Sequence, residues 1–346
     1  MNKKQFSYSE AILEATQEEM RRDKKVFVLG QGVDDPKGTL GTTLGLDKLF
    51  GKTRCFDTPI AEESTMGFTI GAALAGLRPI NVHIRMDFLL VCMNQLVNMA
   101  AKMSYMSGGQ LKVPIVIRCA IGRSWGQGAQ HSQALQSFFS HVPGFKVVMP
   151  SLPNDAKNCL KKSIRDNNPT IFIENRMLYG ITEKKVKSFI IKKEKARVLK
   201  RGKDITIVGI SYMAIESLRA RDYLLHKSIN AEIIDPIWIN PLDIDTIVKS
   251  VKKTKKLLVV DNGWLSYGVS SEILTQVLER LNNYKIKFKR MGFFDSTCPT
   301  TKNLEIEFYP DSFKIAQTAY SMVTNKNNWK LSGPESKEIS NFKGPF

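Results

Sequence analysis

Short apolar segments alternate with amphipathic segments along most of the chain, and this alternation limits the possible folds more than any other feature. In the first half, continuous apolar runs are followed by segments with helical periodicity; the runs are 25–33, 78–84, 113–120 and 169–176. Continuous apolar strands between helices are typical of a parallel sheet that helices cover on both faces. The sequence therefore predicts the α/β class, with doubly wound, mostly parallel sheets.

The second half repeats the pattern after a change in composition. Residues 189–204 are charged and lack long periodicity, and four further apolar strands follow at 205–211, 229–236, 255–264 and 286–293. A chain of 346 residues suits two domains of ordinary size. We therefore predict one domain over 1–188, a smaller α/β domain over 189–324, and a polar extended tail over 325–346.

Composition excludes several classes of protein. No apolar run reaches the ~20 residues that a membrane helix needs, and no secretory signal is evident. The five cysteines are scattered, without a CxxC pair, which is typical of reduced thiols in the cytoplasm. The net charge of +18 fits solvated lysine faces or a polyanionic partner. Since no nucleic-acid-binding signature accompanies that charge, nucleic-acid binding is the weaker interpretation.

Two places carry residues suited to chemistry. Glu62 and Glu63 follow a Thr-Pro pair and begin a helix rich in small residues, although carboxylates in a first turn are also explained by the helix dipole. His131 lies where a glycine-rich loop meets a helix, near the carboxyl edge of the expected sheet, the usual place for ligands. An ordinary loop histidine is the alternative there.

Several motifs in order resemble one family. The stretches "DTPIAE", "GAALAGLRPI", "GAQHSQ", "PGFKVVMPSLPNDAK", "IRDNNPTIFIEN" and "DNGWLSYGVSSEI" resemble the β subunit of thiamine-diphosphate-dependent 2-oxo acid dehydrogenases. Pyruvate, branched-chain and acetoin dehydrogenases belong to this transketolase-like family. The resemblance covers about residues 6–323. It implies decarboxylation of a 2-oxo acid and transfer of the acyl group to lipoamide.

The resemblance assigns roles to four residues. Glu62 matches the glutamate that binds the ring nitrogen of the cofactor's aminopyrimidine and stabilises the imino tautomer, which deprotonates the thiazolium carbon. Ile60, in the same motif, is expected beside the cofactor, and Phe88 matches an aromatic residue that packs against its pyrimidine ring. His131 matches the active-site histidine that contacts the substrate or the acyl-transfer partner.

Metal binding and partners also follow from the resemblance. Four backbone carbonyls match a potassium site of some members, although a plain helix C-cap explains them equally well: Ile115, Ser163, Asp166 and Asn168. The family holds the cofactor's diphosphate and magnesium with a GDG motif on the α subunit, and no GDG occurs here. We therefore expect an α subunit as partner, in an α2β2 heterotetramer.

The chain departs from the family in three respects. Gln31 replaces an acid on a proton path between the two sites, and Arg85 either brings positive charge to the substrate mouth or faces outward. A net charge of +18 matches poorly with the basic domain of a lipoyl acyltransferase core, so whether the chain docks to such a core stays an open question.

Two alternatives remain: a split transketolase-like or acyloin-forming carboligase acting on an aldehyde acceptor, and a non-catalytic basic binding protein.

Overall fold

The chain forms two compact units. The computed structural model describes residues 5–123, 126–187, 189 and 191–334. The first unit combines 1–122 with 138–193, and the second combines 123–137 with 194–346. The segment that carries His131 thus belongs with the second unit, although it lies between two parts of the first.

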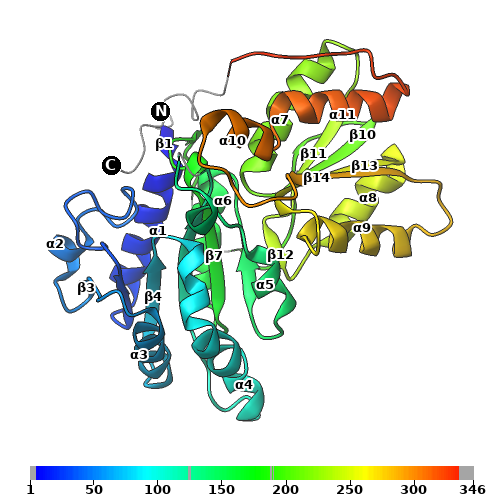
Figure 1. Ribbon diagram of the computed structural model, residues 1–346. Helices are drawn as coiled ribbons and strands as arrows, with labels where there is room; N and C mark the ends of the chain where they lie inside the picture. The colour runs from blue at the N-terminus through cyan, green and yellow to red at the C-terminus, as the bar shows by residue number, and fades with distance from the viewer. Residues whose placement is uncertain (1–4, 124–125, 188, 190, 335–346) are drawn as a thin grey trace. The chain divides into compact units, whose positions relative to one another are not determined.

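The first unit is built on parallel strands. Their order is β6 (Lys146–Val148), β7 (Thr170–Asn175), β5 (Val116–Ile121), β4 (Arg78–His83), β2 (Val26–Gly30) and β3 (Cys55–Phe56). Every pair among these six neighbours is parallel. A separate antiparallel pair joins β1 (Gln5–Ser7) to β8 (Thr182–Lys184). All carboxyl ends of the six strands therefore meet at one edge of the sheet (Figure 1).

Helices cover this sheet. They are α1 (Tyr8–Arg22), α2 (Leu46–Phe50), α3 (Glu62–Leu74) and α6 (Pro153–Arg165), with the short turn η4 (Arg176–Leu178). The turn η3 (Ala129–His131) belongs to the second unit, and α5 (Gln136–His141) begins there and continues into the first. The Ser7 side chain caps α1 by accepting a hydrogen bond from the Glu10 amide. Buried Ala11, Ile12 and Ala15 of α1 face the core, as the helical spacing predicts.

Residues 86–106 form three short pieces and not one long helix. They are the 3₁₀ turns η1 (Met86–Cys92), the π-helical η2 (Gln95–Ala100) and the short α4 (Met103–Met106). The amide of Ala101 donates to the carbonyl of Leu96, five residues back. This wider turn is the π-helical spacing, which interrupts an α-helix and is frequent at functional sites.

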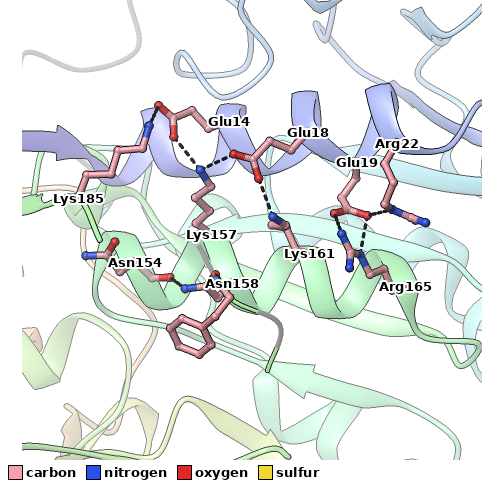
Figure 2. Close-up of polar contacts among 11 residues, drawn as sticks. Glu14, Glu18, Glu19, Arg22, Asn154, Lys157, Asn158, Lys161, Arg165 and Lys185 are labelled. Carbon is pink, nitrogen blue, oxygen red and sulfur yellow. Dashed lines mark hydrogen bonds and ion pairs between the residues drawn. The ribbon is translucent and has the colours of Figure 1, made fainter. Parts of the chain in front are cut away.

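Ion pairs join α1 to α6 along their length. Figure 2 shows acidic side chains of α1 facing basic side chains of α6. The Lys157 ammonium lies 2.9 Å from Glu14 Oε2 and 2.6 Å from Glu18 Oε1. Further along, the Arg165 guanidinium donates two hydrogen bonds to Glu19. The two helices thus share a layer held by charge as well as by packing.

The second unit has its own sheet. The order is β14 (Lys287–Phe293), β13 (Lys256–Trp264), β10 (Ile205–Gly209), β11 (Ala231–Asp235) and β9 (Arg197–Lys200). Only the β9–β11 pair is antiparallel among these neighbours in the described residues. Helices α7 (Tyr212–Leu225) and α11 (Ser312–Thr324) pack on each other, as do α8 (Ile244–Thr254) and α9 (Val269–Arg280) (Figure 1). The remaining elements are β12 (Trp238–Asn240) and α10 (Lys302–Phe308).

The first residues of the predicted tail pack against the second unit. The Trp329 ring lies 5.1 Å from the Tyr320 ring of α11, and Gln317 Nε2 donates to the Leu331 carbonyl. Residues 335–346 of the predicted tail lie outside the described residues. The five cysteines are free thiols, all buried. In the part of the chain that the structure describes, no helix is long and apolar enough to cross a membrane.

Candidate functional site

Glu62 is a buried carboxylate at the first position of α3. Only 7 % of its surface is exposed, whereas its neighbour Glu63 is exposed. The residue before the helix, Ala61, offers no side-chain cap, so the carboxylate lies at an N-terminus where the helix dipole favours negative charge. Glu62 and Glu63 are adjacent in the sequence but differ in burial.

Gln31 holds the Glu62 carboxylate. Its Nε2 donates to Glu62 Oε1 over 3.0 Å, and within the described residues no donor reaches Glu62 Oε2. Gln31 directly follows β2, where Gly30 has φ of 141° and a Cβ would lie 2.2 Å from the Val82 carbonyl. Glycine is therefore required at position 30, because any side chain there would push β2 away from β4.

His83 is a buried histidine beside Glu62 that sequence analysis did not single out. It ends β4, is 5 % exposed, and its Nε2 is buried without a hydrogen-bond partner among the residues that the structure describes. Burial lowers the pKa of His83 to about 4, although the Glu62 charge partly opposes this. The available signal was a histidine in a largely apolar stretch, "INVHI".

The other predicted residues of this region have different environments. Phe88 is half-buried within η1, and Ile60 is 84 % exposed just before α3. Arg85 is only 9 % exposed, so the outward-facing alternative is wrong. Burial lowers the pKa of Arg85 while the nearby Asp87 raises it, which indicates that the two charges lie close together.

The segment that carries His131 is anchored within the second unit. His131 is half-buried at the end of η3. Gly128 has φ of 67°, and a Cβ there would lie 2.7 Å from the Thr300 side chain. Gln136 Nε2 donates to Asp261 Oδ1 and to the Asn262 carbonyl, at 3.2 and 3.1 Å. His131 and Glu62 thus belong to different units, each with a defined local geometry.

The four carbonyls predicted to bind potassium lie near the C-terminus of α6 and the strands beside it. The Ile115 carbonyl accepts from the Thr170 amide, and the Ser163 carbonyl accepts from the Asp166 amide. The Arg78 guanidinium donates to the Asp166 carbonyl over 3.1 Å and so places a cation at the helix end. Asn168 is exposed. These are the contacts of a helix C-cap, and potassium binding stays a prediction.

No cluster that could hold a transition metal accompanies these residues. Among the described residues, no group of three or more His, Cys, Asp or Glu side chains is arranged to bind a metal ion. The chemistry available at Glu62 is therefore that of a single carboxylate with neutral polar neighbours, Gln31 and His83.

Comparisons with family models and with curated proteins point to the same family. The transketolase pyrimidine-binding domain matches residues 4–182, and the transketolase C-terminal domain matches residues 194–315. The pyruvate dehydrogenase E1 component subunit beta of Rickettsia bellii is 43 % identical over 319 residues, covering 90 % of this chain and 96 % of that protein. The mitochondrial pyruvate dehydrogenase E1 component subunit beta of Bos taurus is 41 % identical over 280 residues, covering 80 % of this chain and 78 % of that protein.

A solved structure supports the fold. A split gene transketolase, described as an inactive beta4 tetramer, matches with a TM-score of 0.77 at 21 % identity, over 92 % of this chain and 99 % of that one. The predicted two-domain α/β fold is thereby confirmed. Together with the two domain matches, the similarity over 96 % and 78 % of these two relatives shows that the chain belongs to the transketolase-like family of pyruvate dehydrogenase E1 component β subunits.

Proposed function

We propose that the chain is the β subunit of a thiamine-diphosphate-dependent enzyme that decarboxylates a 2-oxo acid and transfers the acyl group to lipoamide. Family membership supports the oxidoreductase class and the use of thiamine diphosphate. The observation that carries the proposal is the state of Glu62: buried, with one carboxylate oxygen held by Gln31 and the other without a donor among the described residues.

The residues around Glu62 fit an aminopyrimidine. In the proposed complex Glu62 Oε2 accepts a hydrogen bond from a protonated ring nitrogen, while the hydrogen bond from Gln31 Nε2 to Oε1 orients the carboxylate. The half-buried ring of Phe88 supplies an aromatic surface in the same unit. When bound, thiamine diphosphate supplies a nucleophilic carbon that accepts the 2-oxo acid and stabilises the electron pair left by decarboxylation. The chain's own part is to bind, orient and hold a proton.

A partner subunit completes the proposed site. The sequence contains no GDG motif, so we assign the diphosphate and magnesium to an α subunit. In the first unit, α3 packs against η1 and η2, and these elements expose large apolar side chains: Phe68 (56 %), Val91 (55 %), Leu90 (39 %) and Met99 (38 %). Exposed apolar groups on adjacent elements are typical of a protein interface. They support the assembly of this chain with an α subunit in an α2β2 heterotetramer.

The test compares two neighbouring carboxylates in the complex with the α subunit. Glu62→Gln should lower 2-oxo-acid-dependent reduction of an artificial electron acceptor by roughly 100-fold or more, because proton transfer assisted by a side chain contributes about that much. Hydrogen–deuterium exchange at the thiazolium carbon should slow in parallel. Glu63→Gln, at the exposed neighbour, is the matched control and should stay close to wild type.

Acceptor specificity tests the second half of the proposal. With the 2-oxo acid that gives the highest turnover, oxidised lipoamide should accept the acyl group on one sulfur while its disulfide is reduced and the other sulfur becomes a thiol. Product formation with aldehydes but not with lipoamide would instead identify a carboligase. A complex that turns over none of the 2-oxo acids and exchanges no proton would identify a non-catalytic protein.

A further inference from the structure

His83 presents a buried polar group that the folded chain leaves unused. Neither ring nitrogen of His83 has a hydrogen-bond partner within the residues that the structure describes, and Nε2 is fully buried. Buried polar side-chain atoms almost always have a partner, in the protein or in something bound to it. An orphaned imidazole at 5 % exposure therefore points to a ligand or a water that is absent from the chain itself.

The position of His83 brings it to the edge where ligands bind. β2 and β4 are neighbouring parallel strands, with Gly30 opposite Val82. Gln31 follows the carboxyl end of β2, and His83 ends β4. Ligands of open α/β sheets bind outside the carboxyl ends of the strands. Gln31, Glu62 and His83 therefore meet at one edge, and the effect of the Glu62 charge on His83 agrees with this.

We propose that His83 is a second hydrogen-bonding residue of the cofactor site, whose imidazole contacts the polar edge of the aminopyrimidine that Glu62 binds. The inference rests on the proposed function. A neutral imidazole offers one donor and one acceptor, and Glu62 Oε2 offers an acceptor. An aminopyrimidine carries ring nitrogens and an amino group in one plane, so it can satisfy both residues at once. An anionic 2-oxo acid fits less well, because its carboxylate would approach the Glu62 carboxylate.

The experiment uses two substitutions in the complex with the α subunit. His83→Phe removes the polar group while keeping an aromatic ring, and His83→Gln keeps a polar group near the position of Nε2. We measure the dissociation constant of thiamine diphosphate by calorimetry with magnesium, and the thermal midpoint of each complex without cofactor. Cys92→Ala is the control, because Cys92 is fully buried and its pKa responds to the Glu62 charge, but among the described residues its thiol donates only to the Leu89 carbonyl.

We expect the substitutions to change cofactor affinity without lowering the thermal midpoint. His83→Phe should weaken cofactor binding by about tenfold, the loss typical of one or two net hydrogen bonds, while the cofactor-free midpoint stays equal or rises. The midpoint should not fall, since the substitution removes an unsatisfied buried group. His83→Gln should recover most of the affinity, and Cys92→Ala should bind cofactor like wild type.

Three outcomes would overturn the inference. Unchanged affinity in His83→Phe would mean that a buried water alone satisfies the imidazole. Equal losses of affinity and midpoint in both His83 variants would indicate a structural role. Unchanged cofactor affinity with a raised KM for the 2-oxo acid would place the substrate, not the cofactor, against His83. Failure of the wild-type complex to bind cofactor would reject the proposed function as well, and so is distinguishable from these.

Discussion

Asp261 is a fully buried carboxyl group in β13 of the second unit. Burial raises its pKa from 3.8 to about 6, although hydrogen bonds from the Ser270 amide and from Gln136 favour the charged form and oppose the rise. Desolvation therefore outweighs the two donors. Because Gln136 belongs to the segment that carries His131, the same carboxyl group also anchors that segment.

The raised pKa of Asp261 predicts a dependence of stability on pH. The folded chain holds this proton more tightly than the unfolded chain, so the contribution is fully present below pH 3.8 and is lost as pH rises through 6. A shift of about two units corresponds to roughly 3 kcal/mol. The free energy of unfolding of Asp261→Asn, relative to wild type, should therefore rise between pH 4 and 6 and level off above.

Urea unfolding followed by tryptophan fluorescence measures this difference. All four tryptophans, at 125, 238, 264 and 329, lie in the sequence of the second unit, so the signal follows the unit that contains Asp261. Other carboxylates titrate in both proteins and cancel in the difference. A difference that stays constant from pH 4 to 7 would show that Asp261 titrates normally.

At the scale of elements, the α1–α6 pair depends on Lys157 more than on its neighbours. Lys157 is 3 % exposed and lies between Glu14 and Glu18, whereas Lys161 is half-buried and lies 2.6 Å from Glu18 Oε2 (Figure 2). Burial would lower the pKa of Lys157, but hydrogen bonds to Glu18 and Glu14 outweigh it and raise the pKa above its ordinary value. The buried ammonium is thus paired on two sides.

Removing the Lys157 ammonium should lower the free energy of unfolding more than removing the Lys161 ammonium does. Lys157→Ala should lower the free energy of unfolding by roughly 2 kcal/mol, less than the roughly 3–5 kcal/mol of a charge left wholly unpaired, because Glu14 keeps Lys185 and Glu18 keeps Lys161. Lys161→Ala, the control, should cost less, because the Lys161 side chain is 12 % exposed and that of Lys157 only 4 %. Urea unfolding followed by circular dichroism compares them. Equal losses in both variants would contradict a special role for the buried position.

The apolar pattern of the sequence predicted some helices and strands better than others. Continuous apolar strands such as β2 and β10 were predictable, because a strand buried on both faces needs apolar side chains throughout. The antiparallel strand β9 was not, since "RVLK" lies in a charged stretch and only its pairing with β11 makes it a strand. The division of 86–106 into η1, η2 and α4 depends on hydrogen-bond spacing, which apolar periodicity does not report.

Site residues were predictable where a sequence motif contains them, and were not predictable where their environment depends on packing in the fold. Glu62 follows from its motif, but only the fold distinguishes buried Glu62 from exposed Glu63. Gln31 was visible as a departure from the family, yet its hydrogen bond to Glu62 joins residues 31 positions apart. His83 was missed because a histidine in an apolar strand is usually a satisfied core residue, and the missing partner is a property of the structure.

At the scale of the whole molecule, the proposed site is incomplete in this chain. We propose Glu62 as the residue for the aminopyrimidine, and the sequence lacks the GDG motif that the family resemblance assigns to diphosphate and magnesium. The exposed apolar side chains of α3 and η1, among them Phe68 and Val91, offer a surface for the subunit that would supply it. Cofactor binding and subunit assembly should therefore be coupled.

This coupling predicts how cofactor affinity depends on the partner. The isolated chain should bind thiamine diphosphate at least about 100-fold more weakly than the complex with the α subunit, because each lost charged hydrogen bond to the diphosphate costs about 1.5–3 kcal/mol. Magnesium should strengthen binding to the complex and leave binding to the isolated chain unchanged. Calorimetry on both, with and without magnesium, measures this. Phe68→Asp, which puts a charge on the exposed face of α3, should weaken assembly and cofactor binding together. Tight, magnesium-dependent binding by the chain alone would show that one chain holds both ends of the cofactor.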